Sequence, residues 1–445
     1  MIELPHWARG DCTPENFSQR FRQLGLSRTV RISRSLPAKR RCRADDPTSF
    51  ATGVSNAERR SGTDRMLRVV GEGAADAVRR LARSGFVEEL TPVRALAYAR
   101  APDGDPAGRL NGQPGQWALD AVGAAEAFAV SAGHSSIRVA ILDTGLDRQH
   151  PEFRGKVVGG YDFVALEALG NPDGSLRGDI HGRDPDWSDD TGHGTHVAGT
   201  LCALGLEMPP GVAGRCQMLI YRVLGTAMEA GRAVGTGTPE GINNGMKAAI
   251  DAGAHVINLS LGLGAFGPVV PHARMVRYAR MHNVVVVAAA GNLGRSDPIY
   301  PGAVPGVVTV GAVDNFGRAT DFSSYGPHVD LAAPGTDIYS AELGGSYGYR
   351  DGTSHAAPLV AGCAALMIAH GHTRGATFRE STIRRLLRDS ARSPRNPNPR
   401  LGAGILNMGR ALRAASELIT AHGAPSGSLD EAHHHRKLAA VSGEI

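Results

Sequence analysis

The sequence predicts an α/β fold: a three-layer α/β/α sandwich with a mainly parallel central sheet, preceded by a small α+β module. From residue 117 onward, short apolar runs without polar alternation are separated by helical patterns. This arrangement is typical of parallel strands that are covered by helices on both faces. Many of the 58 glycines directly follow these runs, as tight strand-to-helix turns require. A chain of 445 residues is also long enough for one large domain and a smaller unit.

The first 64 residues show little periodicity, and we expect a weakly ordered basic region there, with an irregular loop over 38–64. Residues 1–100 contain 18 Arg and 1 Lys against 11 acidic residues, so the positive charge of the chain is concentrated in this part. Aromatic residues that could stack on bases are few here. Solvated guanidinium groups are therefore favoured over a nucleic-acid-binding arm, which remains a distant alternative.

A small α+β module is predicted over residues 65–100. Met66–Val70 has the composition of a strand, 74–84 has the periodicity of an amphipathic helix that ends before Gly85, and 86–90 reads as a second strand. Residues 101–116 are rich in Gly, Pro and Asp and predict an accessible linker.

One large α/β domain is predicted over residues 117–415. We expect strands at 137–143, 217–224, 255–261, 284–292, 307–313 and 329–335. We expect helices at 118–130, 193–204, 239–253, 271–282 and 354–371. Residues 416–445 form a polar tail, in which His433–His435 are expected to be solvated rather than to bind metal.

The sequence shows no clear transmembrane span, secretion signal or disulfide pattern. The longest apolar run, 356–369, contains Pro358 and is too short for a bilayer, so no membrane partner is expected. The N-terminus lacks a basic segment followed by an apolar one, so a cytoplasmic location is the default, with export by another route left open. The five cysteines show no zinc-binding spacing, and free thiols are favoured over a Cys202–Cys216 disulfide.

Three segments carry residues suited to nucleophilic catalysis. Asp143 ends the apolar strand in VAILDTG, where a parallel sheet presents side chains to a crevice. His193 begins a helix in DTGHGTHVAGT, and Ser354 begins another in GTSHAAP. A serine hydroxyl needs a nearby base, imidazole has a suitable pKa, and a buried carboxylate fixes the imidazole tautomer. Each segment alone could be structural, but together they predict a serine nucleophile with its base.

These segments, in the order Asp, His, Ser and spaced by 50 and 161 residues, resemble the signatures of the subtilisin-like (subtilase) family over roughly residues 113–415. The resemblance implies a subtilisin-like fold and a serine endopeptidase that cleaves polypeptides without a cofactor in the chemistry. It implies that Asp143 orients His193, that His193 acts as general base and then acid, and that Ser354 attacks the scissile carbonyl.

Other family features follow from the same resemblance. Asn292, at the end of AAAGN, would donate its amide to the oxyanion together with the backbone N–H of Ser354. The segment Ser260, Leu261 and Gly262, with Gly291, would bind an extended substrate strand by its backbone. The N-terminal module resembles the end of a subtilase propeptide, which implies an intramolecular inhibitor and a zymogen. We expect autocleavage between Ala99 and Gln116; a permanent N-terminal domain is the alternative.

The chain departs from the family in four places. His355 follows the nucleophile where many subtilisins have Met. The calcium-binding loop is shorter than the family's at 204–212, and Glu152 stands where an Asp ligand is common, so the resemblance leaves structural calcium open. The insertion over 173–190 carries clustered carboxylates, for which a solvated loop is favoured over a calcium site. Leu293 follows Asn292, so no acidic residue there favours Lys or Arg at P1, the substrate residue whose carbonyl is attacked.

Two alternative functions share this fold. A transpeptidase or macrocyclase would use the same residues but keep water away from the acyl-enzyme, so its product would not gain the mass of water. A catalytically silent binding protein would fail to react with a fluorophosphonate at Ser354.

Overall fold

The structure is a computed structural model that describes residues 114–166, 171, 174–229, 231–264, 270–393 and 398–421. It also describes the backbone of seven short strands: β1 (Ile2–Glu3), β2 (Arg31–Arg34), β3 (Arg40–Arg43), β4 (Asp46–Thr52), β5 (Met66–Val70), β6 (Ala95–Ala97) and β22 (Ser428–Leu429).

A seven-stranded sheet forms the centre of the molecule, in the order β18-β17-β15-β13-β7-β10-β8. Every pair of neighbours in it is parallel, which confirms the predicted sheet type. Its strands are β7 (Arg138–Asp143), β8 (Val157–Asp162), β10 (Gln217–Arg222), β13 (Val256–Leu259), β15 (Val285–Ala289), β17 (Val308–Val313) and β18 (Leu331–Pro334).

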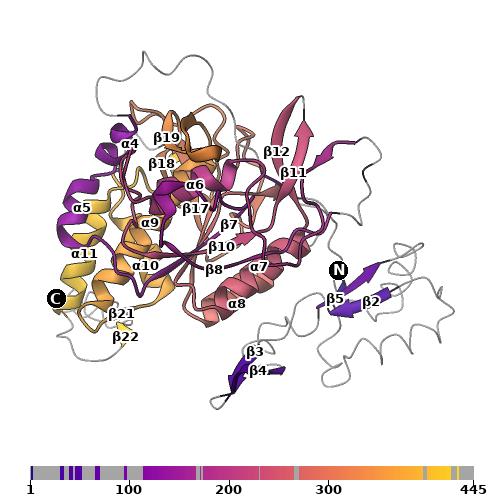
Figure 1. Cartoon of the computed structure of the whole chain (residues 1–445). Coiled ribbons are helices and arrows are strands. Elements are labelled where there is room, and N and C mark those ends of the chain that lie inside the picture. The colour runs from indigo at the N-terminus through magenta and orange to yellow at the C-terminus, as the bar shows by residue number, and fades with distance from the viewer. Residues whose placement is uncertain are drawn as a thin grey trace, which may run out of the picture.

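Helices cover both faces of this sheet (Figure 1). They are α4 (Gln116–Ala121), α5 (Ala124–Val130), α6 (His193–Cys202), α7 (Pro239–Asp251), α8 (Ala273–Met281), α9 (Thr353–His372), α10 (Glu380–Asp389) and α11 (Met408–Ala421), with 3-10 turns at Pro151–Phe153, Leu343–Gly345 and Pro399–Leu401. Smaller strands are β9 (Leu176–Arg177), β11 (Gly225–Glu229), β12 (Arg232–Gly237), β14 (Leu263–Gly264), β16 (Ile299–Tyr300), β19 (Ile338–Ala341), β20 (Tyr347–Arg350) and β21 (Thr377–Phe378).

The core lies in two layers, one on each face of the sheet. Along β7, Val139 and Ile141 belong to the core cluster that includes residues of α6, α9 and α11, whereas Ala140 and Leu142 belong to the cluster that includes residues of α7 and α8. This alternation follows from the period of two in a strand. Six of the seven strands are largely apolar because both of their faces are buried, and these six could be recognised in the sequence. The edge strand β8 was not predicted, because most of its residues are only half-buried and two of them are glycines.

Helix α9 lies inside the molecule. It is the one helix among the described residues with a length and composition that would suit a membrane, yet 94% of its apolar window is buried. Ser354, the residue predicted from the sequence to be the nucleophile, is the second residue of this helix.

Several boundaries differ from the sequence-based expectation. The helix predicted over 118–130 is two helices, because Gly123 adopts a left-handed conformation (φ 68°) between α4 and α5. Helix α11 continues to Ala421, beyond the expected start of the polar tail at 416. The short hairpin β11–β12 was not predicted because its glycine-rich strands lack an apolar pattern.

The N-terminal region is described only in part. Strand β5 coincides with the predicted strand Met66–Val70, whereas the predicted helix at 74–84 and strand at 86–90 lie outside the described residues. The expectation of an irregular loop over 38–64 is wrong where β3 and β4 form an antiparallel hairpin. Backbone pairing can form such a hairpin without the apolar alternation on which the prediction relied.

The cysteines of the described domain are free thiols. Cys202, Cys216 and Cys363 are all buried and unpaired, so the alternative of a Cys202–Cys216 disulfide is wrong. Burial raises the pKa of each of these thiols, which makes them poor nucleophiles.

Candidate active site

The carboxylate of Asp143 and the imidazole of His193 are in direct contact. Asp143 is the last residue of β7, His193 is the first residue of α6, and Oδ1 of the aspartate lies 2.6 Å from Nδ1 of the histidine. Both side chains are buried. A carboxylate at Nδ1 fixes the proton there and leaves the lone pair on Nε2. In the described part of the chain this buried Nε2 has no hydrogen-bond partner, so it is available to take a proton.

Ser354 lies on the neighbouring helix. It is the second residue of α9, which packs against α6, and the ring of the next residue, His355, lies 5.4 Å from the ring of His193. The Ser354 hydroxyl donates to the backbone carbonyl of Ser260 over 3.0 Å rather than to His193. Proton transfer to His193 therefore requires the hydroxyl to leave this carbonyl.

Ser260 contacts Ser354 in two ways. Besides accepting from the Ser354 hydroxyl, it donates from its own hydroxyl to the backbone carbonyl of Ser354 over 2.6 Å. Asn258 donates to the Ser260 hydroxyl over 2.9 Å. Leu261 packs its side chain into the core, so only its backbone could face a peptide. Gly262 and Gly291 are half-buried on the two segments that continue β13 and β15.

Asn292 is fastened to the start of α9. Its Oδ1 accepts from the backbone N–H of Thr353 over 2.9 Å and from the Thr353 hydroxyl over 2.8 Å. These two bonds fix the amide plane, so the NH₂ group points to the side away from Thr353. Its nitrogen would lie 3.2 Å from a Cβ atom placed on Gly352. The amide thus lies beside the first turn of α9, where backbone N–H groups have no partner within the helix.

Asp189 was not recognised as a positioning residue from the sequence, which suggested it only as a possible calcium ligand. Its Oδ1 accepts from the Thr144 hydroxyl and from the N–H groups of Thr191 and Gly192, over 2.8 to 2.9 Å. Its Oδ2 accepts from the N–H and hydroxyl of Thr195. The carboxylate therefore caps α6 and ties the turn before His193 to the residue that follows Asp143. An acidic residue a few positions before a helix start was the available signal.

Close packing explains the glycine after His193. A Cβ atom on Gly194 would lie 2.2 Å from the backbone oxygen of Gly145, which no side chain could tolerate. The N-terminus of α6 can therefore approach the end of β7 closely enough for the contact between His193 and Asp143.

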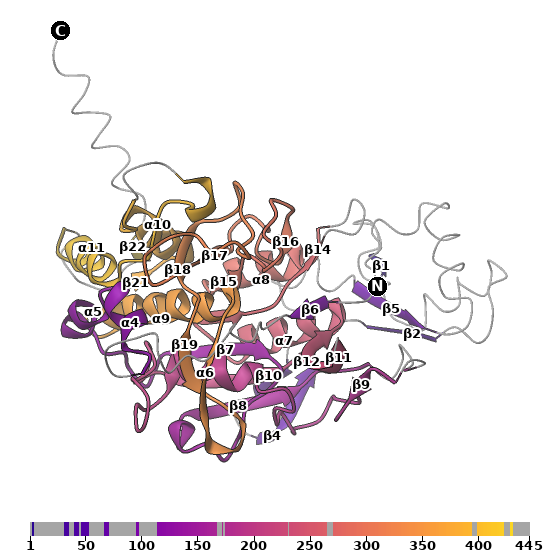
Figure 2. The ribbon, with the colours of Figure 1, turned by 90° about the horizontal axis from the view of Figure 1, so that it is seen from above.

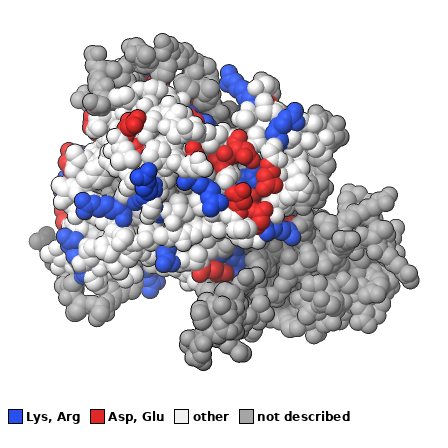
Figure 3. Space-filling view, in the orientation of Figure 1, with Lys and Arg blue, Asp and Glu red and all other residues white. Residues whose placement is uncertain are grey.

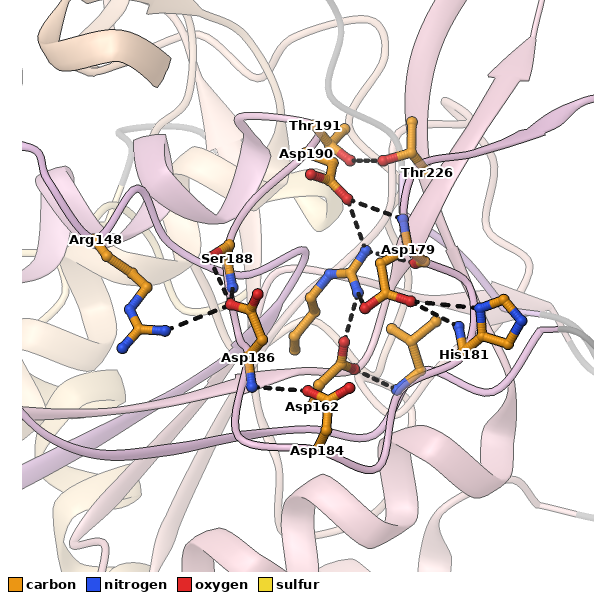
Figure 4. A network of polar contacts seen from close by, with 12 residues as sticks. Arg148, Asp162, Asp179, His181, Asp184, Asp186, Ser188, Asp190, Thr191 and Thr226 are labelled. Atoms are coloured by element: carbon orange, nitrogen blue, oxygen red, sulfur yellow. Dashed lines mark hydrogen bonds and ion pairs between the residues drawn. The ribbon is translucent and has the colours of Figure 1, made fainter.

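Asp179, Asp190 and Asp162 come together in one network of polar contacts (Figure 4). The cation that they share is Arg222, the last residue of β10. Arg222 is buried and bonds Asp162 over 2.5 Å, Asp190 over 3.1 Å and the backbone oxygen of Asp179 over 2.8 Å. Burial outweighs the nearby guanidinium and raises the pKa of Asp162 to about 6. Acidic side chains also gather in one cluster on the face shown in Figure 3.

Those contacts change the expectation for the insertion. Asp179 and Asp190 pair with a buried cation while about 40% of each side chain stays exposed, and Asp184 and Asp186 accept backbone N–H groups, so the insertion is solvent-facing, as expected, but tied down by its carboxylates. Asp173 lies outside the described residues. Among the residues that the structure describes, no group of three or more His, Cys, Asp or Glu side chains is arranged to hold a metal ion.

The position expected for structural calcium is occupied by protein contacts. The fully buried carboxylate of Glu152 accepts from the N–H groups of Gly205, Leu206 and Glu207 over 2.6 to 3.0 Å, and from the Tyr347 hydroxyl over 3.2 Å. Loop amides donate to the carboxylate where carbonyl oxygens would be needed as cation ligands. The residues present at Glu152 therefore do not fit a calcium ion.

His355 is fully buried against two other imidazoles. Its ring centroid lies 5.4 Å from that of His193 and 4.4 Å from that of His196, and neither of its nitrogens has a hydrogen-bond partner among the described residues. Burial, with the nearby imidazoles and Arg350, holds the pKa of His355 well below its usual value. His355 is therefore neutral throughout the neutral pH range.

Comparison with known proteins identifies this arrangement. A family model described as "Subtilase family" matches residues 134–404. The chain belongs to the subtilase family. This subtilase is 41% identical, over 55% of its length and 55% of the relative's, to the thermophilic serine proteinase of Bacillus sp. (strain AK1). It is 36% identical to thermitase of Thermoactinomyces vulgaris, over 58% of this chain and 84% of thermitase, and 34% identical to subtilisin Savinase of Lederbergia lenta, over 67% and 98%.

Solved structures agree with the fold. A protease from Pseudoalteromonas arctica superposes with a TM-score of 0.57 at 30% identity, covering 66% of this subtilase and 94% of that chain. The prenylagaramide maturation protease PagA superposes with a TM-score of 0.54 at 27% identity, covering 65% and 98%. The family and its named proteinases make this subtilase a peptide-bond hydrolase, and they favour neither the transpeptidase nor the silent binding protein.

Proposed function

We propose that this subtilase is a serine endopeptidase that cleaves polypeptides through an acyl-enzyme on Ser354, with Asp143, His193 and Asn292 as its partners in the chemistry. The observation that most supports this assignment is the buried 2.6 Å contact between Asp143 and His193, with Nε2 of the histidine left unpartnered beside the helix that carries Ser354. Nothing in the mechanism requires a cofactor.

In the proposed reaction, the Ser354 oxygen attacks the substrate carbonyl carbon while its proton passes to Nε2 of His193. The negative oxygen of the tetrahedral intermediate accepts hydrogen bonds from the Asn292 amide and the Ser354 N–H. The C–N bond then breaks as His193 gives the proton to the leaving amine, which leaves the acyl-enzyme. Water repeats the sequence, with the proton again passing through His193, and releases the carboxylic acid and Ser354.

The release of Ser354 from Ser260 fits this scheme. In the structure the hydroxyl donates to the Ser260 carbonyl, which holds it in place without activating it. A peptide that lies along Ser260–Gly262 would need backbone partners from the same segment. Binding of substrate therefore provides a reason for the hydroxyl to turn toward His193.

The test is hydrolysis of an unbiased peptide library by the wild-type protein and by Ser354→Ala. Cleavage products that gain the mass of one water, and that disappear in the variant, are expected. Ser296→Ala removes an exposed serine and should cleave as the wild type does. Equal cleavage by Ser354→Ala, or products without added water, would contradict the assignment.

We also propose that the N-terminal segment occupies the substrate cleft as an intramolecular inhibitor until it is cut. Strand β6 supports this proposal, because it pairs antiparallel with β12 through Ala95, Leu96 and Ala97, and it also lies against β14 (Figure 2). An extended segment between two strands is how a bound peptide adds to a protease cleft.

Autocleavage between Ala99 and Gln116 then follows from the proposal. Intact mass spectrometry should find the wild-type protein shortened and Ser354→Ala at full length. Two identical full-length masses would show that the N-terminal region is permanent.

The loop after α6 is the place where calcium binding would be expected in this family. We propose that the Glu152 carboxylate holds residues 205–207 there, so this loop takes no calcium ion. The support is the set of three backbone N–H donors around one buried carboxylate.

A further inference from the structure

Two polar side chains interrupt the apolar face of β13 that is turned toward α9. Val256 belongs to the core cluster that includes residues of α9, whereas Ile257 and Leu259 belong to the cluster on the other face of the sheet. Because side chains alternate along a strand, Asn258 and Ser260 follow Val256 on the side of α9. Both are fully buried. Buried polar side chains require hydrogen-bond partners, so their contacts indicate what they do.

The backbone carbonyl of Ser354 has no partner four residues further along α9. A helical carbonyl normally accepts from the N–H four residues later, which for Ser354 would be that of residue 358. This residue is Pro358, which has no N–H and whose ring crowds the carbonyl four residues before it. The Ser354 carbonyl therefore needs a donor from outside the helix. In the structure this donor is the Ser260 hydroxyl, at a distance of 2.6 Å.

Asn258 determines the direction in which the Ser260 hydroxyl donates. The amide nitrogen of Asn258 donates to the Ser260 oxygen over 2.9 Å. Because an amide NH₂ group only donates, the single proton of the Ser260 hydroxyl stays available for the Ser354 carbonyl. The amide oxygen of Asn258 is buried and has no hydrogen-bond partner among the residues that the structure describes. An unpaired acceptor in the core is unfavourable, so packing alone does not account for asparagine at this position.

These contacts fix the backbone on both sides of the nucleophile. The peptide plane that follows Ser354 is held at its two ends, by Ser260 at the carbonyl and by the N–H of the next residue, which donates to the oxygen of Gly352 over 3.0 Å. The peptide plane that precedes Thr353 is held by Asn292, whose oxygen accepts the Thr353 N–H. The N–H between these two planes is that of Ser354, which the proposed mechanism uses for the oxyanion.

We propose that Asn258 and Ser260 are positioning residues for the nucleophile. The Ser260 hydroxyl takes the place of the N–H that Pro358 lacks, and Asn258 directs that hydroxyl, so the N–H and the hydroxyl of Ser354 are aimed before a substrate arrives. This inference rests on the proposed endopeptidase function and adds to it a role for two side chains. A substrate strand would meet Ser260 through its backbone, so a substitution of the side chain tests the positioning role separately.

The experiment measures kcat and KM for one peptide, at a temperature where every variant is folded. Ser260→Ala removes the donor and keeps the backbone. It should lower kcat about 10- to 100-fold and leave KM nearly unchanged, since a small displacement of a reacting group slows catalysis by up to this factor. Asn258→Ala keeps the Ser260 hydroxyl but leaves it free to turn, so kcat should fall less.

The double variant tests whether the two residues act in series. Asn258 acts only through Ser260, so Ser260→Ala with Asn258→Ala should be no slower than Ser260→Ala alone. The rate at which a fluorophosphonate labels Ser354 should fall in the same order as kcat. If Ser260→Ala does not fold, the change of kcat against KM in Asn258→Ala decides the question.

A matched control separates positioning from loss of stability. Ser340 is as buried as Ser260, and its hydroxyl also donates to a backbone carbonyl of a helix, that of His196 in α6, over 2.7 Å. Ser340→Ala should therefore lower the midpoint of thermal unfolding about as much as Ser260→Ala, while kcat for the same peptide stays as in the wild type.

The contrary results are distinct. A wild-type kcat in Ser260→Ala, or a rise in KM at constant kcat, would show that the hydroxyl does not position Ser354. Losses of kcat that multiply in the double variant would show that Asn258 does not act through Ser260. An equal loss of kcat in Ser340→Ala would assign the effect to stability. No cleavage by the wild-type protein would instead mean that the proposed function fails, and this inference with it.

Discussion

At the scale of single residues, the site depends on polar atoms that are held in place before a substrate arrives. Asn292 is the clearest example, because its amide oxygen is fixed by two bonds to Thr353 and its nitrogen is thereby aimed independently of the substrate. Donors that are already oriented need not reorganise as charge develops on the carbonyl oxygen.

Replacing Asn292 with Ala should lower kcat and leave KM nearly unchanged. Removing one such donor from a subtilisin lowers kcat about 100- to 1,000-fold, and we expect the same range because the negative oxygen exists only after attack. Steady-state kinetics on one peptide measure both constants. A rise in KM at constant kcat would show that Asn292 binds the ground state instead.

His355 is a buried neutral imidazole next to the nucleophile. Because its pKa is held well below the usual value, the folded state resists its protonation, whereas the unfolded chain takes up the proton near pH 6.5. This contribution to the free energy of unfolding is therefore present above pH 6.5 and is lost as the pH falls below that value. His196 contributes in the same direction.

The substitution His355→Met should make the unfolding temperature less dependent on pH between about 6.5 and 5, while the pH–rate profile at neutral pH stays as in the wild type. It should also make activity more sensitive to dilute peroxide, because a thioether beside Ser354 can be oxidised. Scanning calorimetry and residual activity measure the two effects. A pH–rate profile that shifts in the variant would mean that His355 titrates in the folded protein.

At the scale of elements, loops near the site are fixed by single carboxylates. Asp189 caps α6, Asp162 and Asp190 hold the acidic insertion to Arg222, and Glu152 closes the loop over 205–207. Each carboxylate accepts hydrogen bonds from backbone N–H groups or from a buried guanidinium, which are the stronger kinds because one partner is charged.

From the contacts of Glu152 we predict how the stability of the loop over 205–207 responds to a substitution and to metal removal. Glu152→Gln should lower the free energy of unfolding by about 1–3 kcal/mol, because an amide nitrogen cannot accept from the loop. Chelation by EDTA should not speed limited proteolysis of the wild-type protein within 204–207, where Leu204 and Leu206 are exposed. Faster cleavage there with EDTA, reversed by added calcium, would show that a metal holds the loop.

At the scale of the whole molecule, the catalytic fold was predictable where burial on both faces made strands apolar and glycines marked the turns. Asp143, His193 and Ser354 could be named as candidates because each lies at or next to the end of such an element. What could not be predicted depends on contacts between distant segments. Arg222 looks like the end of an ordinary strand until the insertion folds over it.

Contacts between distant segments also explain why the expectations for the insertion and for the loop at 204–212 were incomplete. The carboxylates of the insertion suggested solvation or calcium because no sequence pattern shows that Asp179 and Asp190 pair with a buried guanidinium 43 and 32 residues later in the chain. Likewise, the shortening of the loop at 204–212 was visible in the sequence, but its attachment to Glu152 depends on the direction of three N–H groups.

The most direct test is the reaction of the native protein with a fluorophosphonate, followed by peptide mapping. One adduct per chain is expected, on the peptide that contains Ser354, and it should be absent in Ser354→Ala and strongly slowed in His193→Ala. Labelling of another serine, or equal labelling of the wild type and His193→Ala, would show that Asp143 and His193 do not activate Ser354.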